Sequence, residues 1–292
     1  MKTSVIGVIA LFGFAVAMPR GDFRGQDKGG KGEGKDKEPP VKKLAAVKVD
    51  SRDGVIKGFV EYDGTPPTRE MIADMEKADT PKECKEAPEE QTIKQTWIVD
   101  PKTKRVANVM VFLKPPKGNY FPFDKSKITF PERVEIDQPH CAFVPHVSAV
   151  FPVYFDGKKE VKTGQVLRVK NSAPFPHNAN YTGDETIGTG NIKIGTGEHK
   201  DLAFPASSTQ PVRFKCDLHN WMRAIVWSFD HPYVAVTNDK GEFTIKNVPA
   251  GVDLTLVAWH EGKNPDELKG FFEEPIKVKA GEKLTKKLKV KQ

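Results

Sequence analysis

One segment of the chain reads Val212-Arg213-Phe214-Lys215-Cys216-Asp217-Leu218-His219-Asn220-Trp221-Met222-Arg223-Ala224-Ile225-Val226. Apolar and charged residues alternate before Cys216, and an apolar run follows the loop, so the segment predicts a strand, a tight loop and a second strand. The loop carries a thiol, an imidazole and a thioether on Cys216, His219 and Met222. These are donors that suit copper as it moves between its two oxidation states. A second imidazole is needed to complete the set, and His177 is the upstream candidate.

The same residues also have a purely structural interpretation. Buried cysteine and methionine are common, so Cys216 and Met222 could fill a core while His219 lies at the surface. Two features favour a metal site instead. The centre of the segment is polar and loop-like, and Cys216 is left over if the other two cysteines pair. Zinc would prefer four ligands of similar donor strength in a tetrahedron.

The first residues have the form of an export signal. Lys2 precedes an apolar run from Val5 to Ala17 that is too short to span a bilayer, so residues 1–17 predict a secretory signal peptide. Residues 18–46 are rich in Gly, Lys, Asp and Pro and predict a flexible linker without a fold. No later segment has the length and hydropathy of a membrane span. We therefore expect a soluble protein that is periplasmic or secreted.

The basic balance of the chain does not by itself indicate a nucleic-acid partner. The formal net charge is +7 and the sequence pI is about 9.1. The basic residues are spread out, and many lie in the linker and in Lys283–Lys291. The sequence shows neither a basic helix nor the aromatic and basic interleaving of nucleic-acid-binding proteins. A solvated, lysine-rich surface is the favoured interpretation.

Short strands separated by Gly- and Pro-rich turns fill the rest of the sequence. This pattern predicts an all-β fold, an antiparallel sandwich or barrel. Strands are predicted at residues 55–62, 92–99, 106–113, 133–136, 164–171, 233–237, 242–245, 252–259, 274–279 and 284–291. The one predicted helix spans Arg69–Ala78, and the Gly- and Thr-rich stretch Thr182–Lys200 predicts an exposed loop. A boundary near residue 230 gives two predicted domains, at 47–230 and 231–292.

The three cysteines of the chain predict one disulfide and one thiol with another task. Pairing of Cys84 with Cys141 is expected because export exposes the chain to an oxidising compartment. In the alternative, Cys141 joins His140 or His146 in a second metal site, which would leave Cys84 a free thiol. His146 is thus a possible additional ligand, although a hydrogen-bonded structural histidine is the favoured interpretation.

Two motifs resemble the metal loops of plastocyanin-type cupredoxins. They are Asn171-Ser172-Ala173-Pro174-Phe175-Pro176-His177-Asn178 and Phe214-Lys215-Cys216-Asp217-Leu218-His219. The resemblance implies that His177, Cys216 and His219 are strong copper ligands and Met222 a weak axial one. It also implies that Asn178 ties the histidine loop to the cysteine loop, acting on the metal through the ligands.

The position of the methionine departs from the plastocyanin pattern. Met222 comes three residues after His219, closer than in plastocyanin-type loops. This His-x-x-Met spacing is closer to that of the dinuclear copper domain of cytochrome oxidase. The second bridging cysteine of that domain is absent here, so the resemblance implies a mononuclear site.

Further pieces resemble exported proteins called methylamine-utilisation-like. These pieces are Cys141-Ala142-Phe143-Val144-Pro145-His146-Val147, Cys216 to Met222, His231-Pro232-Tyr233, and Asn247-Val248-Pro249-Ala250-Gly251 before Trp259-His260-Glu261. The resemblance implies a Greek-key cupredoxin sandwich followed by a small carboxypeptidase-regulatory-like β-sandwich. It does not imply a role in amine metabolism.

The function expected from these features is single-electron transfer between redox partner proteins that dock transiently, without bond chemistry of its own. An apolar rim near Pro176, Trp221 and Met222 is expected to admit such a partner. The alternatives are a copper carrier or buffer, a metal-free structural or adhesion protein of the surface, and a copper enzyme. An enzyme would need an open coordination position and a substrate pocket, and the sequence specifies neither.

Overall fold

A computed structural model describes residues 44–262 and 271–291 of the chain. Within these residues the fold is almost entirely β, with nineteen strands and three short helical elements, which confirms the predicted all-β class. The described helices include none that is long and apolar enough to cross a membrane. The predicted signal peptide and all but the last three residues of the predicted linker lie outside the described residues, so both stay predictions.

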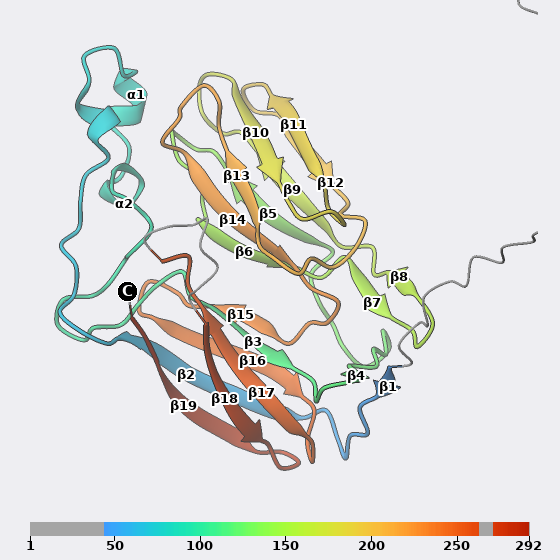
Figure 1. Ribbon diagram of the computed structural model, residues 1–292. Helices are drawn as coiled ribbons and strands as arrows, with labels where there is room; N and C mark the ends of the chain where they lie inside the picture. Colours follow the sequence, from blue (N-terminus) through green and yellow to red (C-terminus); the bar gives the residue numbers. More distant parts are fainter. Residues whose placement is uncertain (1–43, 263–270, 292) are drawn as a thin grey trace, which may run out of the picture. The chain divides into compact units, whose positions relative to one another are not determined.

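The first sandwich consists of a five-stranded and a three-stranded sheet (Figure 1). The five-stranded sheet has the order β11-β10-β13-β14-β6 and the three-stranded sheet the order β12-β9-β5. Their bounds are β5 Arg133–Asp137, β6 Val147–Val150, β9 Val166–Lys170, β10 His177–Thr182, β11 Thr189–Ile194, β12 His199–Leu202, β13 Val212–Lys215 and β14 Arg223–Ser228. Most pairs are antiparallel, but β14–β6 and β5–β9 are parallel, which strand periodicity alone does not reveal.

Alternating side chains explain why these strands form a core. Val212 and Phe214 of β13 are buried, whereas Lys215 between the strand and the loop is exposed. Leu167 and Val169 of β9 are buried in the same way from the opposite sheet. The resulting core includes Cys216 and Met222, so the loop of interest begins and ends in packed structure.

The prediction of an exposed loop at Thr182–Lys200 is wrong. This stretch contains β11 and the start of β12, and β11 pairs with β10 over six residues. Only Ile194 of β11 is buried, because β11 lies at the edge of its sheet. Ile192 and Ile194 alternate with polar residues, but this pattern is short and stands in Gly- and Thr-rich sequence, so the pairing with β10 was not apparent.

The second sandwich combines strands from both ends of the described chain. A four-stranded sheet has the order β15-β3-β17-β18 and a three-stranded sheet the order β16-β2-β19. Their bounds are β2 Gly54–Tyr62, β3 Met110–Lys114, β15 Val234–Val236, β16 Glu242–Val248, β17 Asp253–Trp259, β18 Phe271–Lys277 and β19 Lys283–Val290. Two smaller sheets pair β1 Ala45–Ala46 with β4 Asn119–Tyr120, and β7 Val153–Phe155 with β8 Glu160–Lys162.

These pairings cross the boundary expected near residue 230. β2 lies between β16 and β19, and β3 lies between β15 and β17, so early and late strands share both sheets. Strand periodicity identifies each strand but not its partner, which is why a division in chain order was expected. The division of the chain into domains at 47–230 and 231–292 stays a prediction, as does the carboxypeptidase-regulatory-like character of the C-terminal part.

A third apolar cluster joins the two sandwiches. It unites β14 and β6 of the first with β3 and β17 of the second. Its centre is the edge-to-face pair of Trp227 and Trp259, whose ring centroids lie 5.5 Å apart at 80°. Phe112 of β3 meets Trp227 in a similar way at 5.2 Å. Such aromatic pairs are specific in geometry and bury a large apolar area.

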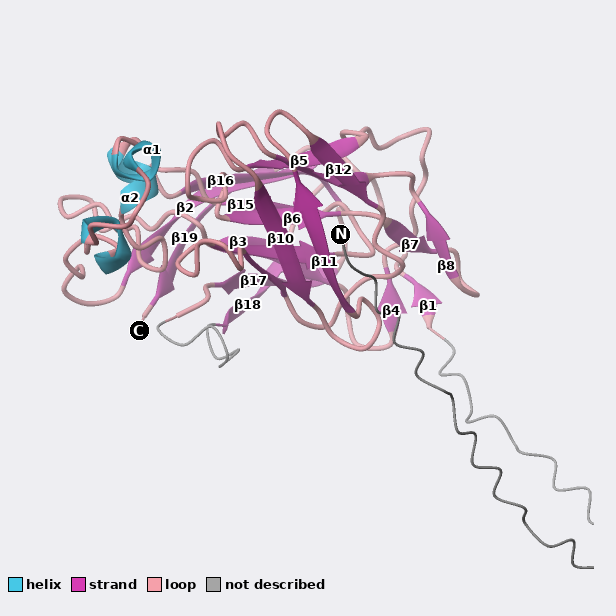
Figure 2. Cartoon of the chain, turned by 90° about the horizontal axis from the view of Figure 1, so that it is seen from above, coloured by secondary structure: helices cyan, strands magenta, loops and turns pink. Residues whose placement is uncertain are grey.

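The segment between β2 and β3 differs most from the predictions (Figures 1 and 2). The predicted helix Arg69–Ala78 is only the 3₁₀ turn η1, Ala73–Glu76, and Met71 is 51% exposed. The predicted strand 92–99 has only isolated bridges and is preceded by two short helices, α1 Lys82–Lys85 and α2 Glu89–Thr92. Each short helix starts directly after a proline, Pro81 or Pro88, which cannot continue a helix from upstream.

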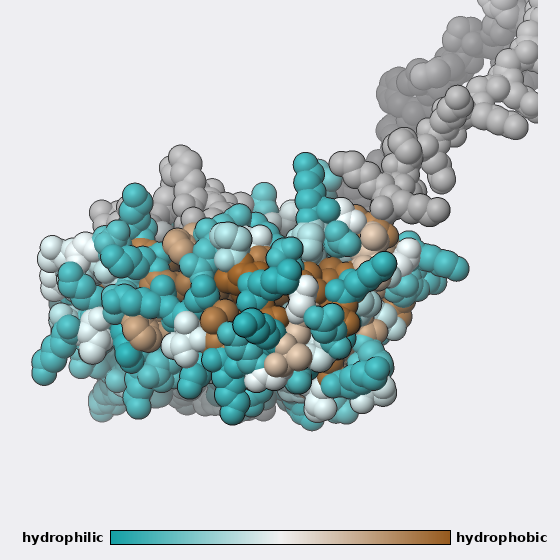
Figure 3. Space-filling view, turned by 90° about the horizontal axis from the view of Figure 1, so that it is seen from below, coloured by the Kyte–Doolittle hydropathy of each residue, from teal (hydrophilic) through white to brown (hydrophobic). Residues whose placement is uncertain are grey.

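The lysines of the last strand lie in a charge-balanced surface. Lys287 of β19 pairs with Glu61 at 2.6 Å, and Lys286 pairs with Glu274 at 2.7 Å. The face of the molecule seen in Figure 3 is covered mainly by hydrophilic side chains, with hydrophobic groups visible between them. Basic residues of this kind are solvated and paired with carboxylates, and they do not form one continuous region of positive charge.

Candidate metal centre

Cys216, His177 and His219 come together at one end of the first sandwich. The Cys216 Sγ atom lies 3.7 Å from Nδ1 of His177 and 3.9 Å from Nδ1 of His219. One potential ligand atom from each residue lies within 4.8 Å of the other two. All three residues are buried. The predicted histidine loop and cysteine loop therefore meet in space, although His177 and Cys216 are 39 residues apart in the chain.

Strand register explains this meeting. β10 and β13 are antiparallel neighbours, with Asn180 opposite Lys215. His177 begins β10 and Cys216 follows β13 directly, so both lie at the same end of the sheet. The β13–β14 hairpin closes between Lys215 and Arg223, which places residues 216–222 in a single tight connection.

Backbone hydrogen bonds within residues 216–222 hold this connection between β13 and β14 in a compact form. The N–H of Met222 donates to the carbonyl of His219 at 2.9 Å, and the N–H of Cys216 donates to the carbonyl of Met222 at 3.4 Å. The Met222 side chain is buried in the same apolar core as Cys216. The structure thus places Met222 beside the predicted ligands, and its axial role stays a prediction.

Asn178 hydrogen-bonds to the cysteine loop from the histidine strand. Its Oδ1 atom accepts from the Cys216 thiol at 3.2 Å and from the backbone N–H of Asp217 at 2.8 Å. Its Nδ2 group donates to the Asp217 carboxylate at 2.8 Å. These bonds hold the two metal loops in register, because one amide side chain contacts both the Cys216 thiol and the next residue, Asp217.

The Asp217 carboxylate is the hub of a polar network outside the centre. It accepts hydrogen bonds from Asn178, Asn180 and Asn191, and Lys215 lies 3.1 Å away. The bonds from Asn180 and Lys215 are the largest causes that lower the pKa of Asp217 to about 2. The carboxylate is therefore ionised over the whole neutral and mildly acidic range.

The His177 ring is held in a single orientation. Its Nε2 atom lies 2.6 Å from the carbonyl oxygen of His140, so Nε2 carries the proton and donates it. The lone pair of Nδ1 is then directed toward Cys216. Burial, followed by the nearby His219 ring, lowers the pKa of His177 to about 4, and burial also lowers the pKa of His219. Both imidazoles are therefore neutral at pH 7, the form that binds metals.

Aromatic side chains surround the two histidines. Phe175 lies 5.2 Å from the His177 ring and 5.6 Å from the His219 ring, measured between centroids. Trp221 meets His219 edge to face at 5.2 Å and donates its Nε1 proton to the Cys141 carbonyl at 3.1 Å. Of the expected apolar rim, Pro176 is exposed and Trp221 half-buried, but Met222 is buried. Leu218, which sequence reasoning did not single out, is 62% exposed.

The expected disulfide joins Cys84 of α1 to Cys141, and both residues are buried. The sulfur of Cys141 is therefore not available for the alternative site with His140 or His146. Cys216 is the free cysteine of the described chain. An arrangement that the sequence did not reveal is the proximity of this disulfide to the centre. A ring nitrogen of His219 lies within 4.8 Å of both disulfide sulfurs.

His146 has both ring nitrogens engaged. Nδ1 lies 3.0 Å from the Arg223 carbonyl and Nε2 lies 2.6 Å from the Glu261 carboxylate. Burial alone would lower the pKa of His146, but Glu261 outweighs it and raises the pKa above the ordinary value. Among the described residues, His146 is not in the ligand group around Cys216. The geometry favours the hydrogen-bonded structural interpretation.

The other histidines have structural surroundings. His260 stacks on Trp97 at 3.7 Å, and burial lowers its pKa to about 4. His231 is buried, stacks on Tyr233 and accepts from its backbone N–H at 3.2 Å. His199 is exposed at the start of β12. None of these rings belongs to the group around Cys216 in the described chain.

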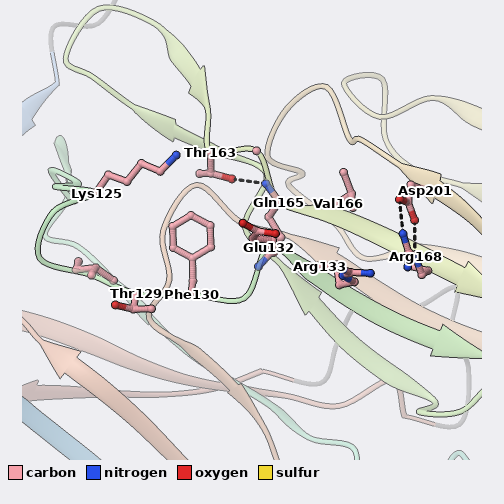
Figure 4. A pocket seen from close by; sticks show the side chains of 12 residues that line it. Lys125, Thr129, Phe130, Glu132, Arg133, Thr163, Gln165, Val166, Arg168 and Asp201 are labelled. Atoms are coloured by element: carbon pink, nitrogen blue, oxygen red, sulfur yellow. Dashed lines mark hydrogen bonds and ion pairs between the residues drawn. The ribbon is translucent and has the colours of Figure 1, made fainter.

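A cavity of about 500 Å³ lies elsewhere, at the ends of β5 and β9 (Figure 4). Several of its polar side chains are engaged within the protein. Arg168 makes two bonds to Asp201 at 2.7 and 2.8 Å, and Gln165 is used by the backbone of Phe151 and Pro131. None of the predicted metal ligands lines this cavity. The His–Cys–His cluster is therefore the stronger candidate site.

The fold and site define an all-β protein with a buried His–Cys–His donor set. No protein-family model matches the chain, and no curated protein matches it. Solved structures match part of it. A copper-containing nitrite reductase from Thermus scotoductus SA-01 is 16% identical, with a TM-score of 0.28, over 37% of this chain and 25% of that chain.

Two smaller copper proteins match as well. A reduced amicyanin variant is 14% identical, with a TM-score of 0.25, over 40% of this chain and 99% of that chain. A purple cupredoxin from Nitrosopumilus maritimus is 16% identical, with a TM-score of 0.24, over 33% of this chain and 99% of that chain. The chain spans a quarter of the nitrite reductase and nearly all of the two smaller proteins. These likenesses are weak, so the geometry of the site itself is the evidence for its function.

Proposed function

We propose that this protein is an exported, mononuclear copper protein that carries single electrons between redox partners. One observation carries the proposal. The Cys216 sulfur lies within 4 Å of Nδ1 on both His177 and His219, in a buried site closed by hydrogen bonds. Copper held there would supply a one-electron couple, and the protein itself would make and break no substrate bonds.

The donor set fits copper better than zinc. One thiolate and two neutral imidazoles form a three-ligand set. Met222, which is buried in the same apolar core as Cys216, would supply a thioether as a weak fourth ligand. Structural zinc sites use four comparable ligands in a tetrahedron, and a methionine is not among their usual donors. Copper in both oxidation states accepts thiolate and imidazole, and an intermediate geometry requires little rearrangement on electron transfer.

The residues of the chain give this site the stiffness that electron transfer requires. The His140 carbonyl fixes the His177 ring, and Asn178 fixes the Cys216 loop. Phe175 and Trp221 exclude water from the histidine side. Exposed Leu218, directly before His219, and Pro176, directly before His177, would allow a partner protein to approach the ligands. The predicted signal peptide and the disulfide support a periplasmic or secreted location.

The test is the visible spectrum of purified protein loaded with Cu(II). We expect an intense thiolate-to-copper band that Cys216→Ala abolishes and that His199→Ala, at an exposed histidine, leaves unchanged. Repeated chemical reduction and reoxidation should restore the band without loss of copper. Release of the metal on reduction would instead indicate a copper carrier. A colourless protein that binds zinc equally well would contradict the proposal.

A further inference from the structure

A second cluster of soft donor atoms lies next to the proposed copper centre. The sulfurs of Cys84 and Cys141 and a ring nitrogen of His219 lie within 4.8 Å of one another, and all three residues are buried. The two sulfurs are joined as a disulfide, with Cα atoms 5.2 Å apart, and in that form they are neutral, weak donors, because the thiolate is the form of cysteine that binds metals.

We infer that the disulfide masks a second metal site: in the dithiol state, Cys84, Cys141 and His219 bind one Cu(I) ion. The separation of the donors is short enough for one ion to contact all three without rearrangement of the backbone. The backbone that carries Cys141 is fixed from both sides. The His140 carbonyl holds His177, and the Cys141 carbonyl holds Trp221.

The chemistry of the donors selects Cu(I). Two thiolates and one imidazole are a soft set of low coordination number, which suits Cu(I). Zn(II) requires a fourth ligand, and the group of candidate donors at this position contains three described residues. A buried, apolar environment also favours a complex with little net charge. Two thiolates around Cu(I) carry one negative charge, whereas the free dithiolate would carry two.

A cavity lies next to the cluster. Its volume is about 320 Å³, and its lining includes Cys141, Trp221 and Met222. Ile72, Gln91 and Ile93 also line it, from the segment that contains η1 and α2. This segment is built from a 3₁₀ turn and two four-residue helices. The cavity therefore reaches Cys141, while Cys141 and Cys84 themselves are buried.

The unmasking step is a two-electron reduction. A dithiol reductant gives two electrons and two protons to the disulfide, and it is itself oxidised to a disulfide, while Cys84 and Cys141 become thiols. Each thiol then loses its proton as its sulfur binds Cu(I). The copper ion enters as Cu(I), so binding involves no further electron transfer.

The new site shares His219 with the proposed electron-transfer centre but not Cys216. The two sites are therefore separated by removing Cys216. The experiment measures Cu(I) bound by the full folded chain in competition with a chromophoric Cu(I) chelator, in the Cys216→Ser background. A phosphine serves as the reductant because added thiols would compete for the metal. Oxidised Cys216→Ser protein should bind no tight Cu(I), and the phosphine-reduced protein should bind one ion.

Two further variants test the ligands in the same background. Adding Cys84→Ser and Cys141→Ser should abolish the tight binding after reduction. Adding His219→Ala should lower the Cu(I) affinity by at least roughly 10–100-fold, the loss seen when a group that hydrogen-bonds to a metal ligand is removed. Unchanged affinity without His219 would overturn the three-ligand site.

A second measurement needs no multiple variant. In the wild-type chain, Cu(I) added after reduction should protect both Cys84 and Cys141 from alkylation, as read by peptide mass. Alkylation of these thiols at the rate seen without copper would overturn the inference, and so would equal protection by Zn(II). A wild-type protein that shows the Cys216 colour but fails this test keeps the proposed function. A colourless protein that passes it keeps only the second site.

Discussion

The Nε2 atom of His177 lies 2.6 Å from the carbonyl oxygen of His140. His140 directly precedes Cys141, so the residue that orients a proposed copper ligand is adjacent to the disulfide. The Cys141 carbonyl in turn accepts from Trp221, which packs on His219. The backbone of His140 and Cys141 therefore positions both the His177 ring and the tryptophan that packs on His219. An outer hydrogen bond of this kind sets the tautomer and the ring orientation of a ligand.

Asn178 is predicted to stabilise both the fold and the centre. Asn178→Ala leaves the Cys216 thiol and the Asp217 N–H without their acceptor, which should cost about 1–3 kcal/mol in the free energy of unfolding. The thiolate-to-copper band should shift, because the Asp217 backbone and the Cys216 loop lose the hydrogen bond that holds them in register with the histidine strand. Asn180→Ala is the matched control, since Asn180 contacts Asp217 but not Cys216. An unshifted band in Asn178→Ala, together with wild-type stability, would show that the tie is dispensable.

The buried pair of His146 and Glu261 should give stability a pH optimum. The pKa of His146 is raised above 6.5, so its contribution is complete below that pH and is lost as the pH rises through the folded value. Burial alone would raise the pKa of Glu261, but His146 outweighs it and lowers the pKa below 4.5. The Glu261 contribution is complete above that pH and is lost as the pH falls through the folded value.

Glu261→Gln should flatten this optimum, because the glutamine keeps the shape but not the charge. The measurement is urea unfolding of metal-free protein from pH 4 to pH 9. Glu185→Gln, at an exposed turn, serves as the control for loss of one carboxylate. The same pH profile in Glu261→Gln and in wild type would contradict a charged pair.

His177 should resist protonation in the metal-free protein. Its pKa is lowered to about 4, mainly by burial, whereas the unfolded imidazole has an ordinary value near 6.5. Between these values the unfolded chain binds the extra proton, so the stability of the metal-free protein should fall as the pH falls from 6.5 to 4. His177→Gln should reduce that slope. NMR titration of the His177 ring checks the cause directly, and a midpoint at the ordinary value would refute it.

The two sandwiches should unfold together. Trp227 lies in the apolar cluster that contacts Phe112 and Trp259 of the second sandwich. Trp227→Ala should cost about 3–5 kcal/mol, the usual loss for a buried aromatic residue. Leu218→Ala, at an exposed position, should change stability by no more than about 0.5 kcal/mol. Separate thermal transitions for the two sandwiches in wild type would show that the cluster does not couple them.

The sequence was informative where chemistry and local periodicity agree. The alternation around Phe214 predicts β13, and the spacing of Cys216 and His219 places both on one tight loop. The pairing of Cys84 with Cys141 was expected because the predicted signal peptide implies an oxidising compartment, and the structure confirms the pairing. The meeting of His177 with Cys216 was accessible only through the resemblance of two motifs, since 39 residues separate them.

What the sequence did not reveal depends on contacts between distant residues. β11 is a mostly polar edge strand that pairs with β10, and its apolar alternation is limited to Ile192 and Ile194, too short to distinguish it from a loop. Met71, Ile72 and Met75 have helical spacing, yet only Met75 is buried, and the proline before α1 breaks the segment. The contact between His219 and the disulfide joins three separate parts of the chain, and no local signal marks it.

The parallel pairing of β2 with β19 places one of the first described strands against the last. β2 therefore cannot complete its sheet until β19 has been synthesised and, on the proposed route, translocated. Contacts this distant in the chain slow folding and leave strand edges open in the interval. A truncation before residue 283 would remove β19 and leave β2 paired with β16 alone.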